Sequence, residues 1–247
     1  EAALFQYMWQ GNLNTSFTGD DNLYVRLKTG NASSWASNKD HGTYLNSSKG
    51  NKDIIKVDKI WYSFPVGESN TVFVGPKIEN YYMHGTTPSI YKPVLKAFTL
   101  GGNAAAYGAS TDTGAGWAYK ADNGFAISSN IGTKSKTTQE DADENYLESG
   151  LLTNESKTSW ATQIGLTKEQ YAVSAMVNMK YNGWGDSYYT AGSGITGNST
   201  NYGLRAWWRP LETGSATPEV SVGYDYSTIA DVADSVDSTD AYFVGLS

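Results

Sequence analysis

The sequence predicts an all-β protein whose antiparallel strands form a sheet of the transmembrane-barrel type. Three observations carry this prediction: apolar and polar residues alternate with period two, short and long connections alternate along the chain, and aromatic residues gather near the ends of the alternating runs. No segment shows helical periodicity over a useful length. The expected fold is therefore built from hairpins with tight turns at one end of the sheet and large polar loops at the other.

The composition of the 247 residues removes several classes of protein. Charged residues make up 17% of the chain, where a soluble domain carries about 25%. No run reaches the roughly 20 apolar residues of a membrane-spanning helix. The absence of cysteine excludes a disulfide scaffold and a thiolate metal site, and the net charge of −7 argues against nucleic acid as a partner.

The run 171–181 shows the alternation most clearly. Its odd positions, from Tyr171 to Tyr181, are apolar, and its even positions are polar or small. Such a run forms a strand with one apolar and one polar face. By the same criterion we expect strands at 7–18, 23–29, 57–66, 71–78, 115–120, 125–132, 158–167, 171–181, 201–210 and 219–228, and the start of another at 240–247.

The connections between these strands fall into two length classes that alternate. The short turns are 19–22, 67–70, 121–124 and 167–170, with 211–218 slightly longer, and all are rich in turn-forming residues. The long loops are 30–56, 79–113, 133–157, 182–200 and 229–240. Transmembrane barrels have short periplasmic turns and long extracellular loops, whereas Greek-key sandwiches mix the two lengths.

The length of the chain fits part of a barrel. A hairpin of two strands, a turn and a loop takes about 44 residues, so the chain holds about five and a half hairpins. The N-terminus lacks the basic region of a signal peptide, and both ends resemble the interior of strands. We expect residues 1–247 to form one incomplete barrel domain.

Aromatic residues near the strand ends provide a second indication. Interfacial girdles of transmembrane barrels place such rings where hydrocarbon meets headgroup. The alternative is that aromatic residues simply favour strands. The pairs in question are Tyr7 and Trp9, Tyr81 and Tyr82, Trp117 and Tyr119, Tyr181 and Trp184, Tyr202 and Trp208, and Tyr224 and Tyr226.

Two segments near the N-terminus resemble a known family. They are Leu-Asn-Thr-Ser-Phe-Thr-Gly at 13–19 with the following 20–31, and Val-Asp-Lys-Ile-Trp-Tyr-Ser-Phe-Pro-Val-Gly at 57–67 with Thr-Val-Phe-Val-Gly at 71–75. Weaker matches occur at 201–205 and 222–224. In these segments the chain resembles cyanobacterial outer-membrane porins, the iron uptake porins of the carbohydrate-selective (OprB-type) porin superfamily.

The resemblance implies a fold, a location and partners. The complete protein would carry a signal peptide, an S-layer-homology domain that binds peptidoglycan, and a barrel of about 16 strands, of which this chain covers roughly strands 2–12. The signal peptide, the wall-binding domain and the C-terminal strands are not in the chain, so peptidoglycan would be a partner only through that absent domain. The resemblance further implies the cyanobacterial outer membrane with its lipid, a homotrimer, and passive passage of small hydrophilic solutes, carbohydrates and inorganic ions, with iron as one candidate.

The segment 82–113 corresponds by this resemblance to the third extracellular loop, which folds into the barrel and narrows it. It contains Pro88, Pro93, Leu95, Phe98 and Leu100, more apolar residues than an outward loop needs, together with His84, Lys92 and Lys96. The alternative is an ordinary surface loop with a few buried residues.

Strand parity assigns the basic residues to the lumen. A Lys or Arg on the lipid face costs about 2–4 kcal/mol at the bilayer midplane, so these residues should face inward. The expected lumen and constriction residues are Arg26, Lys28, Lys59, Lys77, His84, Lys92, Lys96, Lys120, Lys180, Arg205 and Arg209. Asp225 is the clearest lumen carboxylate, so the wall should be cationic with a modest anion preference, unless loop carboxylates and the missing strands cancel it.

Catalysis, cofactors and metals find little support. The chain has two histidines, no cysteine and no Gly-x-Ser-x-Gly motif, although its 25 acidic residues leave a glycosidase open on composition alone. The acidic run 139–145 departs from a calcium loop at Tyr146 and Leu152. We therefore expect no enzyme activity, no cofactor and no metal site.

A rival from another class is a secreted β-sandwich or β-helix module that binds carbohydrate on exposed aromatic rings. It would stay soluble without detergent, whereas a porin would aggregate.

Overall fold

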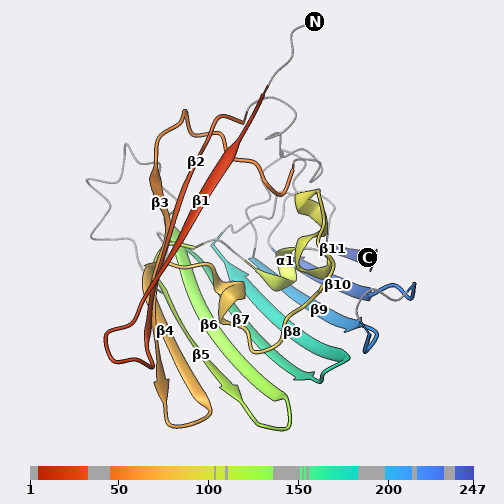
Figure 1. The fold of residues 1–247 in the computed structure, drawn as a ribbon. Coiled ribbons are helices and arrows are strands. Elements are labelled where there is room, and N and C mark those ends of the chain that lie inside the picture. The colour runs from red at the N-terminus through yellow and green to blue at the C-terminus, as the bar shows by residue number, and fades with distance from the viewer. Residues whose placement is uncertain are drawn as a thin grey trace, which may run out of the picture.

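The computed structural model describes residues 5–32, 45–102, 104–108, 111–135, 151, 153, 156–182, 198–212, 216–230 and 237–247. They form one antiparallel sheet of eleven strands that follow one another in sequence order (Figure 1). The strands are β1 (Met8–Thr15), β2 (Asn22–Gly30), β3 (Lys56–Val66), β4 (Asn70–Lys77), β5 (Gly114–Lys120), β6 (Phe125–Ser135), β7 (Ser156–Thr167), β8 (Tyr171–Tyr181), β9 (Asn198–Trp208), β10 (Val220–Ala230) and β11 (Ser238–Leu246).

The prediction of an all-β antiparallel fold is confirmed, and each expected strand is present within a few residues of its expected bounds. The sheet is curved but open. Strands β1 and β11 are its two edges, and each is paired with a single neighbour in the described part of the chain.

Short turns lie along one edge of the sheet, the lower one in Figure 1. At the turn between β5 and β6, Gly124 has φ +87, and a Cβ there would collide with the Thr167 carbonyl, so the position requires glycine. The expected alternation of lengths fails at the last hairpin. Because β10 runs to Ala230, the connection 231–237 is shorter than the connection 209–219, which lies at the short-turn edge.

Residues 78–113 connect β4 to β5 and cross the concave side of the sheet; we call them the strap. The strap contains two 3₁₀ segments, η3 (Asn80–Met83) and η4 (Lys96–Gly101, kinked at Thr99 and Leu100), and the short helix α1 (Ala104–Tyr107). Figure 1 shows α1 and these segments within the hollow of the sheet.

The apolar core lies between the strap and the concave face. One cluster joins Trp61 of β3 to Ile78 and Met83 of the strap. A second joins Tyr107 of the strap to Ala161 and Met176 of β7 and β8. Both clusters are small, and many of the other buried side chains are polar.

Two β-bulges interrupt the strand register near the N-terminus. In β3, Asp58 is an extra residue, because Arg26 pairs with Lys59 while the next residue, Leu27, pairs with Val57. In β4 the register shifts by one residue, so that Lys77 pairs with Ile60. A bulge turns the residues beyond it to the opposite face, so simple parity fails at these two points.

Candidate functional site

The sheet is amphipathic in the reverse sense of a soluble protein. On β8 the polar side chains Asn178 and Lys180 are buried on the concave face, while Tyr171, Val173 and Tyr181 are exposed on the convex face. A soluble sheet buries its apolar face and exposes its polar one. The covered side of this sheet is therefore the polar side.

The same reversal extends along the sheet. Large apolar side chains exposed on the convex face are Trp9, Leu13, Val74, Trp117, Trp160, Ile164, Val173, Tyr202, Leu204, Trp208, Val222, Tyr224, Val244 and Leu246. Leu204, for example, pairs with Ala175 on one side and Tyr224 on the other, so apolar residues form continuous rows across strands. A contiguous apolar surface of this extent marks an interaction site with another apolar phase or protein.

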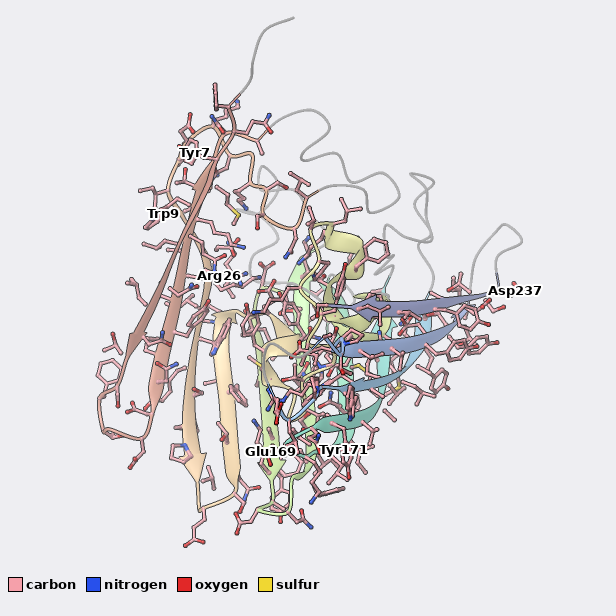
Figure 2. The ribbon with its side chains drawn as sticks, turned by 45° about the vertical axis from the view of Figure 1, so that its right-hand side comes forward. Tyr7, Trp9, Arg26, Glu169, Tyr171 and Asp237 are labelled. Carbon is pink, nitrogen blue, oxygen red and sulfur yellow. The ribbon has the colours of Figure 1, made fainter. Side chains whose placement is uncertain are left out.

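The expected aromatic pairs divide between the two faces. Trp208 pairs with Tyr171 at the short-turn edge of the convex face, and Tyr202 stacks on Tyr226 at a ring distance of 6.5 Å. Figure 2 places Tyr171 beside Glu169 at that short-turn edge. Tyr81 and Tyr82 instead belong to the strap and pack within the concave side, so they do not join a convex girdle. Trp184 lies outside the described residues.

The strap is fixed to β7 through Gln163. Its amide accepts a hydrogen bond from the Thr86 backbone N–H at 2.9 Å and donates one to the Thr86 carbonyl at 2.9 Å. The same amide contacts the Tyr107 hydroxyl, which donates to the Thr86 carbonyl at 2.7 Å. One side chain of the sheet thus joins two separate parts of the strap.

Further bonds extend the attachment across the sheet. Trp207 Nε1 on β9 donates to the Thr87 carbonyl at 3.1 Å, and Ser221 Oγ on β10 accepts from the Ile90 N–H at 3.1 Å. At the far edge, the Tyr91 ring lies 5.8 Å from that of Phe243 on β11. The strap therefore crosses the concave face from β7 to β11 and is attached mainly by hydrogen bonds.

Arg205 on β9 is one of these attachments. Its Nε donates to the Leu100 carbonyl at 2.9 Å, and its Nη2 pairs with Asp225 on β10 at 2.7 Å. The two side chains are 1% and 2% exposed. Arg205 lies on the concave face as parity predicts, but it is neutralised and bound to the strap.

Lys59 has a similar role at the other end of the strap. Its Nζ donates to the Ile78 carbonyl at 3.0 Å and to the Thr111 carbonyl at 3.4 Å, so it joins the beginning and the end of the strap. Burial of this ammonium is compensated by carbonyl oxygens. Lys59 and Arg205, two of the cations expected to line the lumen, thus bind backbone carbonyls of the strap.

A different cluster forms around the bulge in β3. Asp58 Oδ2 accepts from Arg26 Nε at 2.6 Å and lies 3.5 Å from Lys28 Nζ, while its Oδ1 lies 3.7 Å from Lys49 Nζ. Glu79 of the strap pairs with Arg26 Nη2 at 2.5 Å. Figure 2 shows Arg26 on β2, well above the short-turn edge.

The remaining expected site residues are spread over the molecule. Lys180 is buried on β8, whereas Lys120 is exposed at the short-turn end of β5. Lys92 and Arg209 are exposed and line a cavity of about 670 Å³ at the short-turn edge together with Glu169 and Glu219. The expected lumen residues therefore do not converge on one ring among the described residues.

Lys77 differs from the expectation. It pairs with Ile60, whose neighbours Lys59 and Trp61 are buried on the concave face, so Lys77 lies on the convex side. Its Nζ donates to the Val57 carbonyl at 3.3 Å. The bulge in β4 is the reason, and the buried position of the next residue, Ile78, agrees with it.

His84 and Lys96 lie in the strap. The His84 Nδ1 is 3.3 Å from Ser128 Oγ on β6, and its ring meets that of Tyr107 edge-on at 5.2 Å. Burial lowers the pKa of His84 to about 4, so the imidazole is neutral at physiological pH. Burial also lowers the pKa of Lys96.

Sequence reasoning missed Asp58, Glu79 and Gln163. Parity places Asp58 on the apolar face, and only the bulge brings its carboxylate to Arg26. The run 56–59 could have indicated a charge cluster, because two lysines flank the Asp58 carboxylate in a segment expected to be a strand. Nothing local distinguishes Gln163 from other polar strand residues.

Comparisons with known proteins add no relative: the chain matches no protein-family model and no curated protein. No helix in the described part of the chain is long and apolar enough to cross a membrane. The acidic run 139–145 and His41 lie outside the described residues.

Proposed function

We propose that this chain is the larger part of an outer-membrane porin, which passes small hydrophilic solutes and inorganic ions through a water-filled lumen narrowed by the strap. The observation that carries the proposal is the reversed amphipathicity of the sheet. Its convex face is apolar and exposed, and its concave face is polar and covered. A sheet of this kind suits a barrel with lipid outside and water inside.

The strap supports the inward side of this proposal. A loop that narrows a channel must be attached to the inner wall, and the strap is attached from β6 to β11 by side chains of the concave face. Its anchors are buried amides, hydroxyls and an ion pair, all suited to a wall that faces water elsewhere.

The open sheet fits an incomplete barrel. An edge strand presents unpaired backbone groups, and a membrane barrel removes both edges by closure. We propose that further strands pair with β1 and β11 in the complete protein. An outer-membrane location, homotrimeric assembly and a solute range including iron or carbohydrate belong to the same proposal.

The rival carbohydrate-binding module finds less support. A sandwich would cover the apolar face with a second sheet, and a β-helix would pair its strands in parallel. In the described part of the chain there is one antiparallel sheet, and the strap covers its polar face rather than its apolar one.

Reconstitution of the full-length protein into a planar bilayer tests the proposal. We expect stepwise single-channel conductance in salt solution and aggregation once detergent is removed. A protein that stays monodisperse without detergent and produces no conductance would contradict it.

A further inference from the structure

The cations of the concave face belong to two classes. Arg205 and Lys59 are buried and bound to carbonyls of the strap, and Arg205 also has Asp225. A passing ion is attracted weakly to Arg205, because the opposite charge of Asp225 cancels much of its field, and Lys59 is buried away from solvent. Any charge preference of the described wall must then come from cations that are less fully neutralised.

Lys28 and Lys49 in the cluster around Asp58 are such cations, whereas Arg26, which is 4% exposed, pairs with both Glu79 and Asp58. Three basic side chains, Arg26, Lys28 and Lys49, surround this single carboxylate within 3.7 Å. The side chains of Lys28 and Lys49 remain 20% and 35% exposed, so both are less fully covered than Arg205 and Lys59. Lys56, also exposed, is the cross-strand partner of Lys28 and adds a fourth positive charge.

The backbone builds this arrangement. The bulge places Asp58 beside Arg26, since an unbulged strand would turn that carboxylate to the convex face. Lys49 is held by its carbonyl, which accepts from the Ala32 N–H at 2.9 Å, and by the bridge between Asn31 and Gly50. The long-loop end of β2 is thus tied to the segment that carries the third cation.

The charges do not balance within the cluster. Glu79 is the second carboxylate and pairs with Arg26, so four cations face two carboxylates among the described residues. The Asp58 carboxylate itself occupies the point toward which Arg26, Lys28 and Lys49 converge. A small inorganic anion is, like this resident group, negatively charged and able to accept hydrogen bonds from Lys and Arg.

We propose that Lys28, Lys49 and Lys56 form an anion-attracting site on the concave face beside the buried Arg26, with Asp58 as a resident carboxylate that reduces its positive charge. This inference rests on the proposed porin function and assigns its charge preference to one cluster. The solutes it favours are small inorganic anions, chloride and phosphate among them. Asp58 acts as a specificity-determining residue because it sets the excess of positive charge.

Reversal potentials of the full-length protein in a potassium chloride gradient test the site. The triple variant K28Q/K49Q/K56Q should lower the anion-to-cation permeability ratio severalfold. The matched control is K120Q/K134Q/K157Q, which removes the same charge from concave-face positions of β5, β6 and β7 outside the cluster. It should change the ratio much less, and equal shifts in the two variants would overturn the inference.

The Asp58→Asn variant tests the resident carboxylate. It should raise the anion-to-cation ratio and deepen the block of chloride current by added phosphate. A ratio unchanged from that of the wild type would contradict the role of Asp58.

Phosphate binding can be followed without a channel. We expect ³¹P line broadening of inorganic phosphate by the detergent-solubilised protein, and its loss in K28Q/K49Q/K56Q. Binding without conductance would overturn the porin proposal alone, whereas conductance with neither selectivity nor binding at the cluster would overturn this inference alone.

Discussion

Arg26 and Arg205 are both arginines of the concave face, both paired with an aspartate, yet their surroundings differ. The pair of Arg205 and Asp225 lies beneath the strap and is almost fully buried. The Asp58 carboxylate beside Arg26 is 17% exposed and also pairs with Lys28 and Lys49, whose side chains are 20% and 35% exposed. An arginine–aspartate pair is thus a buried anchor in one region, whereas in the other it is the buried centre of a cluster that also holds two partly exposed lysines.

Breaking the covered pair should have the largest effect. Asp225→Asn leaves the buried Arg205 guanidinium without its counter-charge, which typically costs about 3–5 kcal/mol of unfolding free energy. Urea unfolding of the reconstituted protein measures it. The double variant R205M/D225L should recover much of the loss, and an Asp225→Asn protein as stable as the wild type would remove the anchor from our account.

Gln163→Leu should have the next largest effect. It leaves the Thr86 backbone N–H without its partner, while the Thr86 carbonyl keeps the Tyr107 hydroxyl, at a cost of about 1–3 kcal/mol. Hydrogen exchange at the Thr86 amide should accelerate accordingly. Thr162→Val, which removes a hydrogen bond to Ser129 on the convex face, is the control and should leave the strap amides protected.

Asp58→Asn should destabilise the protein less than Asp225→Asn does. Arg26 keeps its ion pair with Glu79, and the side chains of Lys28 and Lys49 are partly exposed to solvent. We therefore expect the unfolding free energy to fall by about 1 kcal/mol. The same urea experiment gives the value. A loss equal to that of Asp225→Asn would show that the two regions do not differ in the way described.

A further prediction concerns pH and the covered region. The pKa of His84 is lowered from 6.5 to about 4, so between these values the unfolded chain binds a proton that the folded chain does not. The unfolding free energy contributed by neutral His84 is fully present above pH 6.5 and is lost as pH falls toward 4.

His84→Gln should therefore show a weaker fall in stability between pH 6.5 and 4 than the wild type. The guanidinium carbon of Arg205 lies 5.5 Å from the centroid of the Tyr107 ring that His84 contacts, and this positive charge disfavours a second cation there. Identical pH profiles for variant and wild type would show that His84 is not buried in neutral form.

The sheet was predictable from the sequence because period-two alternation is a local signal. Within the runs at 171–181 and 201–210, the alternation itself shows which residues share a face of the sheet, and the turn residues locate the hairpin ends. The expectation that 82–113 folds inward came from the family resemblance, and the apolar residues Pro88, Phe98 and Leu100 supported it.

The details of the site were not predictable for physical reasons. The bulges at Asp58 and in β4 depend on pairing between strands, which no single run records, and they move Asp58 inward and Lys77 outward. The roles of Lys59 and Arg205 depend on carbonyls of the strap that are distant in sequence. Parity gives the face of a side chain but not its partner.

The proposed function depends most on contact between the convex face and lipid, and the variant Leu204→Arg tests this contact. Leu204 is 56% exposed on that face. In a bilayer we expect this substitution to lower the unfolding free energy by about 2–4 kcal/mol, and Thr228→Arg, nearer the long-loop edge, by about 0–1 kcal/mol. If the convex face is instead exposed to water, Leu204→Arg will change stability by less than about 0.5 kcal/mol, and that result would contradict the account.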